Sequence, residues 1–261
     1  MDLGLNGRTA LVLGASRGLG RAVARSLLAE GVAVYAAARN LDAVREWKDA
    51  LPMEQQARVM PLSLDLSDDA SVMSAADTVT AAGGVDILVN NSGGPPPGAV
   101  ASLGPDVWTA QFNMMAGRIF LLTNLLLPAM QRKKWGRVLT VASSGIIQPI
   151  PNLALSNSIR SAISGWSKTL SNEVAADGVT VNMVIPGRIH TDRVDQLDGL
   201  AARRRGLTPD DIAAESWSTI PAHRYGRPEE FADVVTFLAS ERASYITGSS
   251  VRVDGGLIRS V

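Results

Sequence analysis

The chain has 261 residues, of which 46% are hydrophobic, with 25 basic and 25 acidic side chains and no cysteine. This composition is too apolar for a disordered chain, and the length fits one folded domain with a substantial core. A formal net charge of zero gives no general attraction to nucleic acid, and the lack of cysteine excludes disulfides and cysteine-based zinc sites. The net charge of zero leads us to expect no nucleic-acid partner. Because only two histidines are present, we also expect no metal site.

Two stretches of the sequence bear on where the protein works. The first ten residues lack the basic segment followed by an apolar one that marks a secretory signal. The longest uncharged stretch, Val138–Ile159, contains prolines, asparagines and serines, which exclude it as a membrane span. We therefore expect a cytoplasmic protein that does not bind membranes.

Short β-branched runs alternate with longer helical patterns along the whole chain, which is typical of stacked βαβ units. The predicted strands are Thr9–Leu13, Val32–Ala37, Arg58–Leu64, Ile87–Asn90, Val138–Val141, Val179–Ile185 and Ser250–Val253. The predicted helices begin near Leu19, Leu41, Asp69, Pro105, Leu153, Thr191 or Pro209, and Pro228. Most strands are continuous apolar runs, as in sheets covered on both faces. The sequence thus predicts a doubly wound, parallel, seven-stranded α/β sheet, the Rossmann fold, in a single domain spanning residues 1–261.

Two segments interrupt this rhythm. Residues 93–98 read GGPPPG, and residues 191–227 are long and polar. Both follow the carboxyl end of a strand, which is the edge where open α/β sheets bind ligands. We expect a substrate lid at about residues 191–227.

A glycine-rich loop follows the first predicted strand. Residues 14–20 read GASRGLG and lead into the first helix. Glycines permit the tight turn and the close approach of a pyrophosphate, whose charge then meets free N–H groups at the helix N-terminus. The alternative is a small-residue contact between helix and sheet. The predicted cofactor-binding residues here are Gly14, Ser16, Arg17, Gly18, Leu19 and Gly20.

The end of the second predicted strand distinguishes between the two nicotinamide cofactors. An acid there would bind the adenosine ribose and repel a 2′-phosphate. Here no acid occurs before Asp42, whereas Arg39 stands at the strand end and Arg17 lies in the glycine loop. Two guanidinium groups near one phosphate favour NADP(H). The alternative is that both arginines are merely solvated.

Together, these and later motifs resemble the short-chain dehydrogenase/reductase family, in its β-ketoacyl-carrier-protein-reductase-like branch, over essentially the whole chain. The motifs are Gly14–Gly20, Asp65-Leu66, Asn90–Gly93, Ser143, Pro186-Gly187 with Thr191, Arg227–Glu230, Ile246–Gly248 and Asp254–Gly256. The resemblance implies hydride transfer between NADP(H) and a carbonyl or alcohol, such as a 3-oxoacyl thioester or a small ketone.

The resemblance also implies roles for further residues. Asp65 and Leu66 would flank the adenine, Asn91 and Gly93 would lie along the ribose, and the nicotinamide end would contact Pro186, Gly187, Ile189 and Thr191. Each has a plainer alternative, since Asp65 can simply brace a turn and Pro186-Gly187 can simply end a strand.

The catalytic positions depart from the family pattern of Ser, Tyr and Lys with an Asn on the preceding helix. Counting from Ser143 places Ser156 at the tyrosine position and Arg160 at the lysine position, and tyrosine occurs only at positions 35, 225 and 245. Met115 stands where the family has its Asn, and Asn113 lies about 200° around the helix from it.

These replacements lower the expected reaction rate without excluding activity. A serine hydroxyl is a far weaker acid than a phenol of pKa about 10, and loss of a general acid removes about 10²- to 10⁴-fold in rate. Arg160, one turn after Ser156, can hold the ribose and stabilise an oxyanion. We assign Ser143, Ser156 and Arg160 as the catalytic set, with Arg160 also binding cofactor. His190, His223 and Tyr225 are substitute acids, or are merely solvated.

Two functions therefore stand side by side. The first is an NADP(H)-dependent oxidoreductase with a rearranged proton donor, and the alternative is a non-catalytic NADP(H)-binding sensor or structural protein. Arg188 can bind an acidic substrate or face water, and the basic run Arg203–Arg205 is typical of a solvated face.

The resemblance and the helix beginning near Leu153 also suggest a homotetramer. That helix carries Ile163, Trp166 and Leu170 at spacings of three and four, which is more apolar surface than one sheet face needs. Ordinary packing on the sheet is the alternative.

Overall fold

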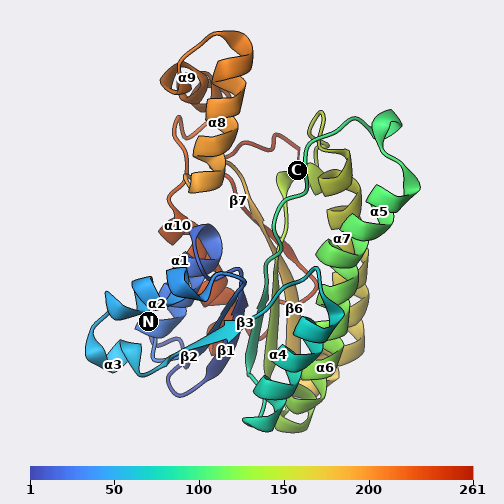
Figure 1. Cartoon of the computed structure of the whole chain (residues 1–261). Coiled ribbons are helices and arrows are strands. Elements are labelled where there is room, and N and C mark those ends of the chain that lie inside the picture. Colours follow the sequence, from blue (N-terminus) through green and yellow to red (C-terminus); the bar gives the residue numbers. More distant parts are fainter. Residues whose placement is uncertain (261) are drawn as a thin grey trace.

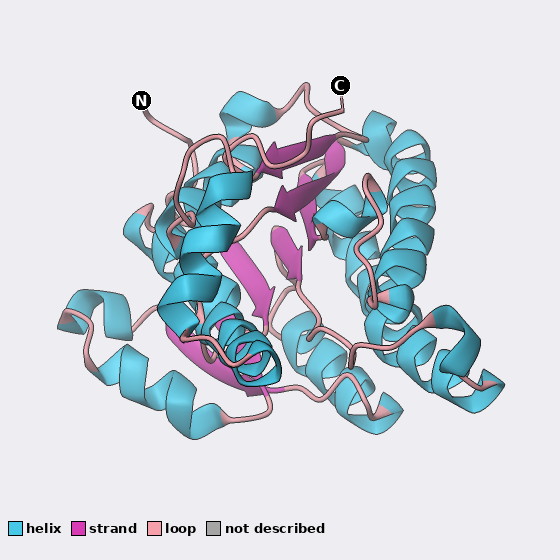
Figure 2. Cartoon of the chain, turned by 90° about the horizontal axis from the view of Figure 1, so that it is seen from above, coloured by secondary structure: helices cyan, strands magenta, loops and turns pink. Residues whose placement is uncertain are grey.

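A parallel sheet of seven strands in the order β3-β2-β1-β4-β5-β6-β7 forms the centre of the molecule (Figure 1). The computed structural model describes residues 1–260. The strands are β1 (Thr9–Leu13), β2 (Ala33–Ala38), β3 (Val59–Ser63), β4 (Ile87–Asn90), β5 (Gly136–Val141), β6 (Val179–Pro186) and β7 (Ser250–Val253). Figure 2 shows helices on both faces of the sheet. The predicted doubly wound parallel sheet is confirmed.

Ten α-helices are present among residues 1–260. They are α1 (Gly18–Ala29), α2 (Leu41–Asp49), α3 (Met53–Gln56), α4 (Asp69–Ala81), α5 (Pro105–Phe112), α6 (Arg118–Lys133), α7 (Ala154–Val174), α8 (Asp192–Arg205), α9 (Pro209–Thr219) and α10 (Pro228–Ala239). The sequence offered Thr191 and Pro209 as alternative helix starts. A helix begins at or next to each of them, α8 at Asp192 and α9 at Pro209.

Local chemistry explains where these helices begin. Proline occupies the first turn of α5, α9 and α10, where its missing N–H costs nothing. The side chains of Asn40, Asp68 and Thr208 accept hydrogen bonds from the first backbone N–H groups of α2, α4 and α9. Helix α1 has no side-chain cap and no acid in its first turn, so its first N–H groups are left for another partner.

The core lies in two layers, one on each face of the sheet. On one face α1, α2 and α10 pack on the strands, and on the other α4, α6 and α7 do so. A third cluster sits at the carboxyl end of the sheet and contains Met115, Leu155 and Ile159. Ile163 is 1% exposed and Leu170 6% exposed, so ordinary packing in the monomer accounts for both.

The start of β5 differs from the prediction because its first two residues, Gly136 and Arg137, lack a strand signal. Arg137 is nevertheless buried, since its Nε donates to the carbonyl oxygen of Ser240 at 3.1 Å and its Nη1 donates to that of Gly136 at 2.8 Å. Its guanidinium also stacks on Trp135, 4.2 Å from the ring centre. Burial lowers the pKa of Arg137 to about 10. Hydrogen bonds to backbone carbonyls and stacking on an aromatic ring thus offset the cost of burying the Arg137 guanidinium in a central strand.

A π-helical turn, η2 (Asn113–Gly117), joins α5 to α6 in one continuous helical stretch. Residues Pro105–Lys133 are long and apolar enough for a membrane span by length and composition alone, a test that core helices of soluble proteins also pass. Here α6 packs on β5 and α4, as a core helix does.

Candidate functional site

A cleft of about 900 Å³ opens at the carboxyl ends of β1 to β4 and β6. This edge includes the point between β1 and β4 where the strand order reverses, which is where open α/β sheets bind ligands. Every predicted cofactor-binding residue except Gly20 and Arg160 lines the cleft. These residues are Gly14, Ser16, Arg17, Gly18, Leu19, Arg39, Asp65, Leu66, Asn91, Gly93, Pro186, Gly187, Ile189 and Thr191.

The glycine loop forms one wall of the cleft. Gly14 has a φ of +65°, a left-handed conformation that favours glycine. A Cβ on Gly20 would overlap the carbonyl oxygen of Gly14, so α1 approaches the strand end only because residue 20 is glycine. The indole N–H of Trp47 donates to the carbonyl oxygen of Ala15 at 3.0 Å and fixes the loop from outside. The predicted small-residue contact is therefore present, and it shapes the cleft.

At the β2 and β3 end, Arg39 and Asp65 face the same space. The backbone N–H of Ser67 and then its hydroxyl, each 2.8 Å from Asp65 Oδ1, lower the pKa of Asp65, with a smaller effect from Arg39. Asp65 thus braces a turn and also presents a stable negative charge to the cleft. Arg17 lies across from Asp192, with 3.8 Å between Nη1 and Oδ2.

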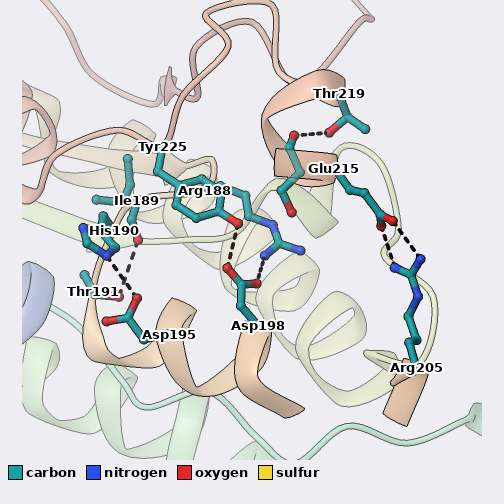
Figure 3. A network of polar contacts seen from close by, with 11 residues as sticks. Arg188, Ile189, His190, Thr191, Asp195, Asp198, Arg205, Glu215, Thr219 and Tyr225 are labelled. Atoms are coloured by element: carbon teal, nitrogen blue, oxygen red, sulfur yellow. Dashed lines mark hydrogen bonds and ion pairs between the residues drawn. The ribbon is translucent and has the colours of Figure 1, made fainter. Parts of the chain in front are cut away.

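The other end of the cleft is formed by the loop that follows β6. Pro186 is the last residue of β6, so it does end a strand, and it also lines the cleft. The three side chains next to this loop that were candidates for acid or anion chemistry are instead bonded to α8, and none of them lines the cleft (Figure 3). The bonds are His190 Nε2 to Asp195 Oδ1 at 3.0 Å, Arg188 Nη1 to Asp198 Oδ1 at 2.9 Å, and Tyr225 OH to Asp198 Oδ2 at 2.7 Å.

Tyr225 and His223 are poorly placed to act as acids. Burial is the main cause that raises the pKa of Tyr225, and its hydroxyl hydrogen is already donated to Asp198. His223 is exposed, with a φ of +54°, in the loop between α9 and α10. Both belong to the scaffold that holds α8 and α9, which project from the sheet in Figure 1.

Arg160 departs most clearly from its predicted role. It is 7% exposed, its Nη1 donates to the carbonyl oxygen of Val141 at 2.8 Å, and its Nη2 donates to that of Ser92 at 3.3 Å. Burial lowers its pKa to about 10. The side chain therefore faces the ends of β4 and β5 and not the cleft, because carbonyls that the strands leave free satisfy its donors.

Ser143 and Ser156 also lie outside the cleft lining. Ser143 is partly exposed, and its Oγ accepts a hydrogen bond from the N–H of Gly145 at 3.1 Å. Ser156 is 8% exposed on the inner face of α7. Met115 is fully buried and Asn113 is exposed, so Asn113 does face elsewhere, as the helical spacing predicted.

The cleft contains residues that the sequence did not single out as functional. Ser92 is 7% exposed, and its hydroxyl has no hydrogen-bond partner among residues 1–260. Its position inside the Asn90–Gly93 motif was the available signal. Further residues of this kind at the substrate end are Gly94, Met114, Asp192, Arg193, Val194 and Gln196, and at the strand ends of the binding end Leu13, Ala37, Ala38, Asn40, Ala43 and Leu64. No functional motif marks those at the substrate end, because they come from the loops and helix ends that surround it.

Comparisons with known proteins agree with this geometry. A family model described as enoyl-(acyl carrier protein) reductase matches residues 14–258. The chain is 35% identical to the 3-oxoacyl-[acyl-carrier-protein] reductase FabG of Salmonella typhimurium, over 98% of this chain and 99% of that one. It is also 35% identical to the uncharacterized oxidoreductase YvaG of Bacillus subtilis over the full length of both. The chain belongs to the short-chain dehydrogenase/reductase family.

Among solved structures, L-sorbose reductase from Gluconobacter frateurii, complexed with NADPH and L-sorbose, superimposes with a TM-score of 0.94. The two chains are 29% identical, and the match covers 100% of each. The fold and the branch of the family that the sequence predicted are thus confirmed.

Proposed function

We propose that this protein is an NADP(H)-dependent oxidoreductase that transfers hydride between the nicotinamide and a carbonyl or alcohol substrate. The observation that carries the proposal is one continuous cleft that joins the glycine loop, Arg39 and the Pro186–Thr191 segment. The similar chains named as reductases, one of them solved with NADPH, support it.

The residues present fit a dinucleotide. Glycines at positions 14 and 20 leave the wall open to a pyrophosphate, and the uncapped N-terminus of α1 offers N–H groups with a positive dipole end. Arg39 pairs with a 2′-phosphate, and Asp65 with Leu66 borders the adenine. The cofactor supplies the hydride when bound, and the chain supplies the orientation of the two reactants.

The active site is atypical in this proposal. Ser143 keeps its hydroxyl hydrogen free while its oxygen accepts from Gly145, so it can donate to a carbonyl oxygen. Ser156 either fills space or relays a proton through water. Arg160 is a positioning residue, because its bonds to Val141 and Ser92 hold the loop that carries Asn91 and Gly93.

Ser143→Ala should lower turnover more than NADPH affinity, since charge on the carbonyl oxygen develops only in the transition state. Ser156→Ala should cost under about tenfold if it fills space and nearer 10²-fold if it relays a proton.

The alternative, a non-catalytic NADP(H) binder, is favoured by one observation, that none of Ser143, Ser156 and Arg160 lines the cleft. A fluorescence titration with NADPH and a screen of carbonyl substrates by nicotinamide absorbance separate the two functions. Binding without turnover, combined with reduction created by Ser156→Tyr with Arg160→Lys, would establish the alternative. Failure to bind NADPH would refute both.

The substrate class in this proposal is a 3-oxoacyl thioester or a small ketone, in line with the names of the similar reductases. The helices α8 and α9, within residues 191–227, are the lid, and the rest of residues 1–261 form the one domain beneath it. Limited proteolysis with and without NADPH tests the lid, since bound cofactor should protect this segment first.

We further propose a cytoplasmic homotetramer without nucleic-acid or membrane partners. Support comes from partly exposed apolar residues on α5 and α7. Val107 and Phe112 are 40% and 39% exposed, and the partly buried Trp166 stacks on Phe120 with ring centres 4.3 Å apart. Sedimentation at micromolar concentration tests the assembly, and cell fractionation tests the location.

A further inference from the structure

The start of α8 contacts two of the loops that form the cleft. At the loop after β1, Thr191 Cγ2 would lie 3.6 Å from a Cβ on Gly18. At the loop after β4, Arg193 Nη2 would lie 3.9 Å from a Cβ on Gly94. Arg193 therefore extends over the loop after β4 and lines the cleft near its substrate end.

Arg193 is the one basic residue among the first seven residues of α8, Asp192 to Asp198. Each acid in these seven residues has a basic side chain outside the helix as its partner. The pairs are Asp192 with Arg17 at 3.8 Å, Asp195 with His190 at 3.0 Å and Asp198 with Arg188 at 2.9 Å; Figure 3 shows the last two. Arg193 has no ion pair or hydrogen bond within residues 1–260. The first half of α8 thus presents one unmatched positive charge, and it faces the cleft.

The surroundings of Arg193 limit what it can bind. The cleft lining here contains Gly94, Met114, Val194 and Gln196, which offer apolar contact and one amide. The carboxylate next to Arg193 in the chain, that of Asp192, also lines the cleft but pairs with Arg17 at 3.8 Å. A guanidinium in such a place pairs most strongly with a carboxylate or phosphate, through two parallel hydrogen bonds.

We propose that Arg193 is a specificity-determining residue that selects carbonyl substrates bearing a carboxylate or phosphate group. This inference rests on the proposed oxidoreductase function and adds the substrate class. Met114 and Val194 contact the carbon chain of such a substrate, and Gln196, one turn after Arg193, supplies a further hydrogen bond.

The cofactor pyrophosphate is the other candidate anion for Arg193. The pyrophosphate site is the uncapped start of α1 at Gly18, which lies against Thr191. Arg193 lies on the other side, beyond Gly93 and against Gly94. The two groups thus contact different loops, Gly18 after β1 and Gly94 after β4, so the substrate is the better occupant.

The test compares oxo acids with their neutral methyl esters, for example acetoacetate with methyl acetoacetate. NADPH oxidation reports turnover, and for a pair that is not turned over, the change in fluorescence of the NADPH complex reports binding.

We expect the unmodified protein to favour the acid by about tenfold or more. Arg193→Gln should raise the KM or Kd of the acid about tenfold, while the NADPH Kd stays within about threefold. Arg193→Lys should restore part of the preference, and Arg204→Gln, an exposed change on the same helix, should alter nothing.

Three results would count against the proposal, and they are distinguishable. Equal use of acid and ester by the unmodified protein overturns it and leaves the oxidoreductase function intact. Equal weakening of NADPH, acid and ester by Arg193→Gln overturns it in favour of the pyrophosphate. If the unmodified protein binds no NADPH, the proposed function fails and this inference fails with it.

Discussion

The two ends of the cleft differ in how their polar side chains are used. At the glycine-loop end, Arg39 and Asp65 face open space, and the N-terminus of α1 is uncapped. At the other end, where catalytic side chains were expected, Arg160 and Tyr225 are already bonded within the protein. The first end is ready to receive a ligand, whereas the second serves to hold the chain in place. A cofactor site formed by backbone geometry can thus be kept even where the side chains at the expected catalytic positions only stabilise the fold.

The largest effect expected at the binding end is that of Gly20→Ala. Its Cβ would overlap the carbonyl oxygen of Gly14, so the loop must move and the NADPH Kd should rise by at least about 100-fold, or about 2.7 kcal/mol. Fluorescence titration measures the change, and circular dichroism confirms the fold. The control is Gly165→Ala on α7, where a Cβ meets nothing within 4 Å. Unchanged affinity in Gly20→Ala would show that the loop does not shape the binding end.

At the catalytic end the comparison predicts loss of stability rather than loss of cofactor affinity. Arg160→Met leaves the carbonyl oxygens of Val141 and Ser92 without their donor, which should lower the unfolding free energy by about 2 kcal/mol. The NADPH Kd should change by less than about tenfold. Urea unfolding measures the first and titration the second, with the exposed Lys168→Met on the same helix as control. A large loss of affinity at unchanged stability would return Arg160 to a direct role in binding.

The charge of Arg39 should give the binding end a preference for NADPH over NADH. NADPH should bind at least about tenfold more tightly than NADH, or about 1.4 kcal/mol, because the guanidinium of Arg39 pairs with the 2′-phosphate. Arg39→Asp should reverse the order, while Arg25→Asp on the outer face of α1 should not. Parallel titrations with the two cofactors measure this. Equal affinities in the unmodified protein would mean that Arg39 is merely solvated.

The smallest effect concerns Asp65, whose lowered pKa comes chiefly from the N–H and hydroxyl of Ser67. A carboxylate with a lowered pKa in the folded state adds stability that is present above its unfolded pKa, about 4, and is lost as the pH falls through the folded value. Asp65→Asn should therefore lower stability by less than about 1 kcal/mol between pH 5 and 8, and the difference should shrink progressively as the pH falls below about 4. Thermal unfolding of both proteins across this range measures it, with the exposed Asp77→Asn as control. A difference that grows in acid would contradict the assignment.

Much of the fold could be predicted because apolar runs between glycine and proline signals locate the central strands. The sequence could not show that Arg137 begins β5, since a charged residue enters a strand only when carbonyls elsewhere in the fold receive it. At the site, the glycine loop predicted the binding end well. Helical spacing placed Arg160 on the same face as Ser156, but the direction of a long side chain depends on which acceptors the neighbouring strands leave free. Arg193 has no motif, because its importance depends on how the acids around it are paired.

The π-helical turn η2 has a consequence for the whole stretch from residue 105 to 133. A π turn contains about one residue more than an α-helical turn, so α5 is rotated by about 100° from the direction it would have as a uniform extension of α6. One uninterrupted helix thereby presents two unrelated faces, with Leu122 and Leu126 directed into the core and Val107 and Phe112 directed outward. Removing one residue from the turn would bring the two faces into phase. Because Met114 belongs to this turn and lines the cleft, such a deletion would also change the shape of the substrate end.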